Sequence, residues 1–107
     1  MVSGIEGRHA VVTGGGRGIG AAIARALTGA GARVTVTGRS EQPLAELVAG
    51  GGAAGYVLAD VTDADAIRSA IESAAAERGP VDILVANAGA AESVPFAKTG
   101  PDVFQRM

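Results

Sequence analysis

The sequence predicts an α/β protein built on a doubly wound parallel sheet, with four strands in the order 3-2-1-4 and helices on both faces. Three observations support this prediction. Short β-branched runs alternate strictly with helical apolar patterns along the chain. These runs are continuously apolar or β-branched rather than alternating, which is typical of strands buried on both faces. The chain of 107 residues leaves room for one compact domain, so residues 1–107 are expected to form a single unit.

The first β-α unit lies at the amino-terminal end of the chain. From Arg8 to Thr13, the run His-Ala-Val-Val-Thr predicts a strand that is closed by glycines. A helix is expected directly after it, because Ile19, Ile23 and Leu27 recur at four-residue steps with alanines beside them. This helix should end at Gly31.

A second unit follows at once. Arg33–Thr37 is another β-branched run, and Ser40 can cap the helix after it. The apolar positions of that helix are Leu44, Leu47 and Val48. Gly50–Gly52 should end the helix and form a surface turn.

The third unit contains the last complete helix of the predicted pattern. Tyr56–Ala59 predicts the third strand, and Thr62-x-x-Asp65 resembles a capping box at the start of a helix. The apolar positions of this helix are Ile67, Ile71, Ala74 and Ala75. Gly79-Pro80 should stop it, and Val81–Ala86 predicts the fourth strand. Beyond an irregular stretch, Pro101–Met107 predicts an unfinished helix.

Composition and charge argue against several classes of function. A formal net charge of -2 gives no electrostatic reason to bind nucleic acid or an anionic membrane. The absence of cysteine excludes disulfides and thiolate ligands and fits a cytoplasmic protein, and with a single histidine no metal site is expected. No apolar run approaches the roughly 20 residues that span a bilayer, and Glu6 interrupts any signal-peptide core. The sequence therefore predicts a soluble protein.

The glycine-rich loop between the first strand and the first helix is the most informative motif. It reads Thr13-Gly14-Gly15-Gly16-Arg17-Gly18-Ile19-Gly20. At such a junction, small residues let a phosphate approach main-chain N–H groups at the start of a helix. A Walker-type loop would end in Gly-Lys-Ser/Thr, but Gly20 is followed by alanines, which disfavours a nucleoside triphosphatase. The pattern is described better as Thr-Gly-x-x-x-Gly-x-Gly than as G-x-G-x-x-G.

With this loop, the chain resembles the short-chain dehydrogenase/reductase family, which has a Rossmann-type dinucleotide-binding fold. Three further segments share the resemblance: Asp60-Val61, Asn87-Ala88-Gly89 and Pro101–Met107. The resemblance implies that Asp60 hydrogen-bonds the adenine ring and that the Asn-Ala-Gly segment braces the sheet and lines the cofactor site. From the residues alone, Asp60 could instead cap the helix near Thr62, and Asn87 could be a turn residue. Thr13 could be only a strand end, although its position favours a bracing role.

The type of nicotinamide cofactor is predicted from the end of the second strand. An NAD-preferring fold usually carries a carboxylate there, whereas this chain has Gly38-Arg39. Arg39 and Arg17 could bring two guanidinium groups to a 2′-phosphate, so NADP(H) is favoured over NAD(H). The alternative is that both arginines are solvated surface charges. The expected cofactor-binding residues are Gly14, Gly16, Arg17, Gly18, Ile19, Gly20, Arg39, Asp60, Val61, Asn87, Ala88 and Gly89.

The catalytic groups that the resemblance implies cannot be assigned in this chain. The family uses a Tyr-x-x-x-Lys pair with Ser and Asn, but here Tyr56 is followed at the fourth position by Asp60, and Lys98 is the single lysine. His9 opens a buried strand, where a structural role is expected. We therefore interpret the chain as the cofactor-binding front half of a longer NAD(P)-dependent dehydrogenase or reductase. A stand-alone, non-catalytic dinucleotide-binding or sensing module is the alternative.

The substrate is only weakly indicated by the sequence. Ala90–Thr99 contains Ser93, Val94, Pro95 and Phe96, which suggest a partly apolar pocket wall. The resemblance implies interconversion of a carbonyl and a secondary alcohol. Reduction of a 3-oxoacyl thioester is the first expectation, ahead of sugar, polyol or steroid alcohols. It also implies a homo-oligomer, usually a tetramer.

Overall fold

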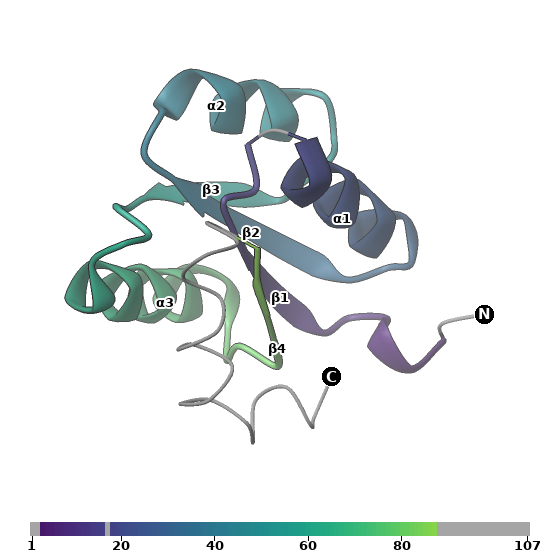
Figure 1. Ribbon diagram of the computed structural model, residues 1–107. Helices are drawn as coiled ribbons and strands as arrows, with labels where there is room; N and C mark the ends of the chain where they lie inside the picture. The colour runs from purple at the N-terminus through teal and green to yellow at the C-terminus, as the bar shows by residue number, and fades with distance from the viewer. Residues whose placement is uncertain (1–2, 17, 88–107) are drawn as a thin grey trace.

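The protein is a three-layer α/β arrangement, and the computed structural model describes residues 3–16 and 18–87 (Figure 1). Its four strands form one parallel sheet in the order β3-β2-β1-β4, which confirms the predicted order. The strands are β1 (His9–Thr13), β2 (Arg33–Gly38), β3 (Gly55–Leu58) and β4 (Ile83–Ala86). The helices are α1 (Gly18–Gly29), α2 (Glu41–Ala49) and α3 (Ala64–Arg78), preceded by a 3-10 turn, Ser3–Ile5.

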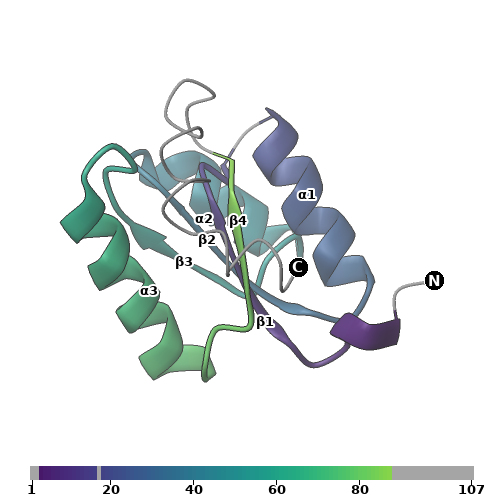
Figure 2. The same cartoon turned by 60° about the horizontal axis from the view of Figure 1, so that its bottom comes forward.

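The helices cover the two faces of the sheet unequally. Figure 1 shows α1 and α2 together on one face and α3 on the other. In the turned view of Figure 2, the strands are seen between α3 on one side and α1 on the other. None of the helices in residues 3–16 and 18–87 has the length and apolar content needed to cross a bilayer.

The boundaries of two strands differ slightly from the prediction. β3 begins one residue earlier than expected, at Gly55, and β4 begins at Ile83 rather than Val81. Asp82 accounts for the later start of β4. Its carboxylate accepts the His9 N–H at 3.0 Å while its own N–H donates to the His9 carbonyl at 2.8 Å. Asp82 therefore joins the start of β1 before the regular pairing with β4 begins.

Apolar packing is concentrated on the face that α1 and α2 cover. Ala10 and Val12 of β1 pack there with Val34 and Val36 of β2, while Val11 faces the smaller cluster under α3. All five residues of β1 are buried, as expected of a central strand with helices on both faces. The buried residues of α1 are Gly20, Ala21 and Ala24. The predicted apolar stripe of α1 was therefore wrong at Ile19, which is 72% exposed at the start of the helix, and at the flanking Ala22 and Ala26, which are also exposed.

The amino-terminal caps of α2 and α3 also correct the sequence prediction. Ser40 occupies the N-cap position of α2 with an extended backbone, but its side chain makes no capping hydrogen bond. At α3 the cap is Asp63 rather than Thr62, because the Asp63 carboxylate accepts the N–H groups of Asp65 and Ala66. Thr62 instead donates its N–H and its hydroxyl to the Asp60 carboxylate.

A buried polar network holds the α3 face together at the amino-terminal ends of the strands. His9 is fully buried, with Nδ1 2.8 Å from the Gly79 carbonyl and Nε2 2.7 Å from the Thr35 hydroxyl. Arg78 Nε donates to the same hydroxyl at 2.8 Å. Since Arg78 can only donate, the Thr35 proton can go to His9 Nε2, and a neutral imidazole protonated on Nδ1 satisfies every group. His9 thus has the structural setting that its position predicted.

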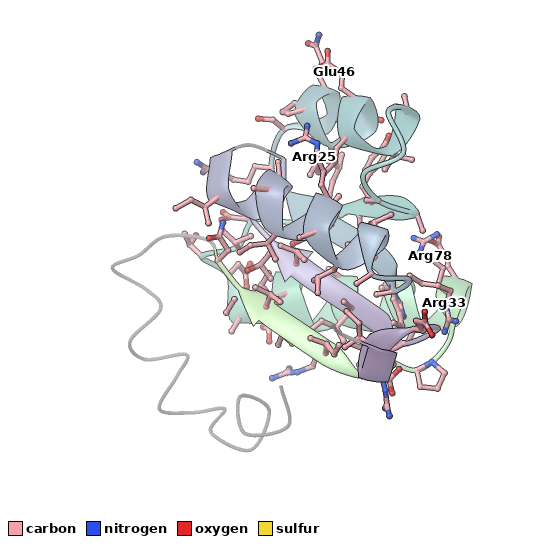
Figure 3. All side chains as sticks on the ribbon, turned by 90° about the vertical axis from the view of Figure 1, so that its right-hand side faces the viewer. Arg25, Arg33, Glu46 and Arg78 are labelled. Carbon is pink, nitrogen blue, oxygen red and sulfur yellow. The ribbon has the colours of Figure 1, made fainter. Side chains whose placement is uncertain are left out.

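The end of α3 is tied to β2 in the same region. Figure 3 shows Arg33 and Arg78 side by side at this end of the sheet, and Arg33 Nε donates to the Arg78 carbonyl at 3.2 Å. The Arg78 guanidinium also lies against the backbone of Gly55, where any side chain would collide with it. Gly55 therefore makes room for the arginine that completes the His9 network.

Two buried threonines of β2 give a matched test of this polar face. Thr37 Oγ1 is buried and has no hydrogen-bond partner in the part of the chain that the structure describes, whereas Thr35 Oγ1 has two. Thr37→Val should raise the free energy of unfolding by about 1 kcal/mol, because it removes an unpaired hydroxyl at constant shape. Thr35→Val should lower the free energy of unfolding by about 2 kcal/mol, because His9 Nε2 and Arg78 Nε both lose their hydrogen-bond partner. Urea unfolding followed by circular dichroism measures both, and equal losses for the two variants would contradict this account.

Candidate nucleotide-binding site

The candidate site lies at the carboxyl ends of β1 and β2, where the glycine loop joins β1 to α1. In doubly wound sheets, ligands bind outside the carboxyl ends of the strands, close to the point where the strand order reverses. Here β1 is the strand from which the chain proceeds to β2 on one side and pairs with β4 on the other. The glycine loop therefore stands at the position that this rule identifies.

Glycine is required in the loop for two steric reasons, a positive φ and a lack of room for a Cβ. Gly14 has a φ of +66°, a conformation that side chains rarely adopt. A Cβ on Gly15 would press into the Val36 side chain, 2.6 Å from its Cγ1. At Gly20 a Cβ would collide with the Gly14 carbonyl and would lie 2.7 Å from Asn87 Nδ2. The loop is thus packed tightly underneath, so its course is fixed by the core.

The main-chain N–H groups of the loop divide into two sets. Those of Gly14 and Gly15 both donate to the Thr37 carbonyl, at 2.8 and 3.1 Å, and so are used within the fold. The N–H groups of the first turn of α1 have no partner within the helix. Gly18 and Ile19 are exposed in that turn, on the solvent side of the loop. An anion placed there would meet free N–H groups and the positive end of the helix dipole.

Thr13 and Asn87 connect the loop to β4. The Thr13 hydroxyl donates to the Val85 carbonyl at 3.3 Å and accepts the Asn87 N–H at 3.1 Å. The Asn87 side-chain amide reaches the Gly14 carbonyl at 3.4 Å. These bonds hold the ends of β1 and β4 and the first glycine of the loop in one arrangement.

An open pocket of about 210 Å³ lies between the glycine loop and the start of α2. Its lining residues are Gly14, Gly16, Gly38, Arg39, Ser40, Pro43 and Leu44. Arg39 supplies a positive charge and Ser40 a hydroxyl. Pockets for drug-sized ligands are usually about 300–1,000 Å³, so this one matches a single part of a dinucleotide. The pocket can hold a polar or anionic group beside an apolar wall.

Asp60 lies beyond the end of β3, within electrostatic reach of Arg39. Its Oδ1 accepts two bonds from Thr62, from the hydroxyl at 2.6 Å and from the N–H at 3.0 Å. The hydroxyl bond, the backbone bond and the charge of Arg39 together lower the pKa of Asp60. Asp60 therefore bonds locally to Thr62, but it does not cap α3, because that cap is Asp63. Its carboxylate stays ionised to a lower pH than that of an ordinary aspartate.

The structure brings most of the predicted site residues to one edge of the sheet. Gly14, Gly16 and Arg39 line the pocket, and Gly18, Ile19 and Gly20 form the start of α1. Val61 is half-buried beside Asp60. Arg17, Ala88 and Gly89, together with Ala90–Thr99, Lys98 and Pro101–Met107, lie outside the described residues.

The sequence analysis does not assign four residues of the pocket wall to the site: Gly38, Ser40, Pro43 and Leu44. In the sequence, Gly38 is informative only because it is not a carboxylate, Ser40 is expected to cap a helix, Leu44 is expected in the core, and Pro43 carries no signal. A signal for Ser40 was available, because a hydroxyl directly after a strand-end arginine is suited to share its anion. Pro43 belongs to the pocket because the first turn of α2 packs against the loop at Gly16.

The fold and the glycine loop together define a Rossmann-type α/β domain. Sequence comparison narrows this class: a profile of the short chain dehydrogenase family matches residues 8–107. The chain therefore belongs to the short-chain dehydrogenase/reductase family. A member of this family uses a nicotinamide dinucleotide as its cofactor.

Similar proteins carry oxidoreductase names. A probable oxidoreductase of Streptomyces antibioticus is 51% identical over 88 residues, which cover 79% of this chain and 30% of that protein. L-xylulose reductase of Mesocricetus auratus is 39% identical over 104 residues, covering 97% of this chain and 41% of the reductase. The chain thus spans about a third of the length of the curated relatives it matches.

Solved structures show the same arrangement. A variant of actinorhodin polyketide ketoreductase with NADPH superposes with a TM-score of 0.71 at 36% identity, covering 78% of this chain and 33% of the ketoreductase. A Serratia marcescens short-chain dehydrogenase/reductase variant gives a TM-score of 0.71 at 40% identity, covering 79% and 37%. The four-stranded order and its flanking helices are therefore shared with members of the family.

Gly20 and Gly29 allow the steric argument for the loop to be tested. Gly20→Ala should lower the free energy of unfolding by about 1–3 kcal/mol, because the new methyl group must displace the Gly14 carbonyl and the Asn87 amide. Gly29→Ala, at the end of the same helix with nothing within 4 Å, should be neutral or should stabilise slightly. Chemical denaturation of both variants provides the measurement. Equal stability of the two would show that the loop is not packed as described.

The bond from Thr62 to Asp60 can be tested by titration. Thr62→Val removes the hydroxyl bond, the largest cause of the lowered pKa, so the Asp60 pKa should rise toward its ordinary value. Thr62→Ser keeps the hydroxyl and should leave the pKa low. Carboxyl ¹³C chemical shifts followed against pH report the group directly. An unchanged pKa in Thr62→Val would show that the hydroxyl does not hold the carboxylate.

Proposed function

We propose that this chain binds NADP(H) as the cofactor-binding half of an oxidoreductase that interconverts a carbonyl and a secondary alcohol. The observation that supports this most directly is the pocket between the glycine loop and Arg39. It places a cation and a hydroxyl beside the glycine loop, which leads directly into the first turn of α1 and its free N–H groups. Such a combination suits a ligand with several phosphates better than a neutral metabolite.

The cofactor would lie across the ends of the strands. Its pyrophosphate would face the amino end of α1, near Gly16, Arg17 and the first helical turn formed by Gly18, Ile19 and Gly20. Its 2′-phosphate would enter the pocket beside Arg39 and Ser40. The adenine would lie toward Asp60 and Val61, and the nicotinamide end would pass over Asn87, Ala88 and Gly89.

The preference for the 2′-phosphate follows from the charges at the end of β2. No carboxylate occupies the position at which one would accept bonds from the ribose hydroxyls and repel a phosphate. Arg39 is exposed and forms none of the salt bridges found among the described residues. The ketoreductase neighbour, whose structure was solved with NADPH, supports the same choice.

The reaction and its setting are proposed from family membership. No described residue is assigned to catalysis, and the described residues serve to bind and orient the cofactor. A 3-oxoacyl thioester is the proposed substrate class, supported by the ketoreductase name of a structural neighbour. The proposed full-length enzyme is a cytoplasmic homo-oligomer, a tetramer as is usual in the family. It is proposed to bind neither nucleic acid nor a membrane.

Arg39 is the residue that tests the cofactor choice. Arg39→Ala should weaken NADPH binding about tenfold to a hundredfold, the loss expected for charge-assisted bonds to one phosphate, and should leave NADH binding nearly unchanged. Arg68→Ala, which removes an exposed arginine of α3, is the control for net charge. Titration calorimetry with both dinucleotides measures the effect. Tighter binding of NADH by the unmodified protein, or an Arg39→Ala variant that still binds NADPH normally, would refute the proposal.

A further inference from the structure

The guanidinium of Arg39 is accompanied by two carboxylates that do not pair with it. Asp60 is near enough for the charge of Arg39 to act on it, and Glu41 is only two residues further along the chain. Arg39 is nevertheless absent from the salt bridges of the described residues. In each case a hydroxyl accounts for where the carboxylate lies.

Asp60 is held by Thr62, as described above. Glu41 is held by Tyr56, whose hydroxyl donates to Glu41 Oε2 at 2.6 Å. Tyr56 is half-buried, and its ring packs against the core cluster under α1 and α2. Since the ring is anchored, its hydroxyl is a fixed point beside the first residue of α2. The carboxylate of Glu41 is therefore drawn toward β3.

The lining of the pocket agrees with this direction. The residues that precede Glu41 in the chain, Arg39 and Ser40, line the pocket, and so do Pro43 and Leu44 after it. Glu41 itself does not line the pocket. A free glutamate at this position could turn toward Arg39 and neutralise it. It would also place a negative charge near any phosphate in the pocket, where like charges repel.

We propose that Tyr56 is a specificity-determining positioning residue: by holding the Glu41 carboxylate on the β3 side of α2, it keeps Arg39 and the pocket free for a 2′-phosphate. This inference rests on the proposed NADP(H) function and adds a residue that does not touch the cofactor. Tyr56 acts only through Glu41, so its effect should vanish when Glu41 has no charge.

The test uses two ligands that differ by one phosphate, adenosine 2′,5′-bisphosphate and adenosine 5′-monophosphate. In Tyr56→Phe, the ratio of their dissociation constants should shift against the bisphosphate by roughly threefold to fivefold, the range of one exposed charge pair. Binding of the monophosphate should change little. The shift should shrink in high salt, because exposed charges are screened.

The Glu41→Gln variant distinguishes a loss of Glu41 positioning from a general effect of Tyr56→Phe on the fold. In this background, the further change Tyr56→Phe should leave the ratio unchanged, since no charge remains to be held. Equal weakening of both ligands by Tyr56→Phe, or an equal shift of the ratio with and without Glu41, would overturn the inference. Thermal unfolding of each variant establishes that it is folded.

The unmodified protein distinguishes this failure from that of the proposed function. If it binds the bisphosphate more tightly than the monophosphate and Tyr56→Phe keeps that preference, the role of Tyr56 is wrong and the NADP(H) proposal stands. If the unmodified protein shows no preference, both proposals fail together.

Discussion

The site depends on one backbone interaction, in which the Thr37 carbonyl accepts the N–H groups of both Gly14 and Gly15. This pair of bonds joins the end of β1 to the end of β2 at the point where regular pairing stops. It turns the first half of the glycine loop toward the sheet. Gly38 and Arg39 lie beside the loop and line one pocket with Gly14 and Gly16.

Much of the fold could be predicted from the sequence, because its signals are local and redundant. Each strand is a short β-branched run and each helix has an apolar period, and parallel connections allow few arrangements. The capping details were predicted less well. Thr62 and Asp63 are adjacent and both can cap a helix, and only the placement of Asp60 explains why the hydroxyl turns away from the helix. Competition between neighbouring groups of similar chemistry is not visible in a pattern.

The site was predictable where it is made of backbone and less so where it is made of side chains. Glycines report main-chain geometry directly, so Gly14 and Gly20 could be assigned from their positions in the loop. Ile19 was assigned to the buried face of α1 as well as to the site, and the structure supports only a position at the exposed end of the helix. Ser40 and Pro43 line the pocket because of how α2 is placed after β2. The hydrogen bond between Tyr56 and Glu41 joins β3 to α2. Neither follows from periodicity.

Leu44 belongs to two parts of the molecule at once. It is 1% exposed and packs in the core cluster, yet it also lines the pocket beneath Gly16. A substitution that reshapes the pocket at this wall must also repack the interior, where a change of even one methylene is felt. Changes in ligand preference along this wall are therefore constrained by folding, whereas the exposed Arg39 and Ser40 can be replaced without repacking the interior. Among proteins that share this fold, ligand preference should accordingly change first at the positions of Arg39 and Ser40 and only later at Leu44.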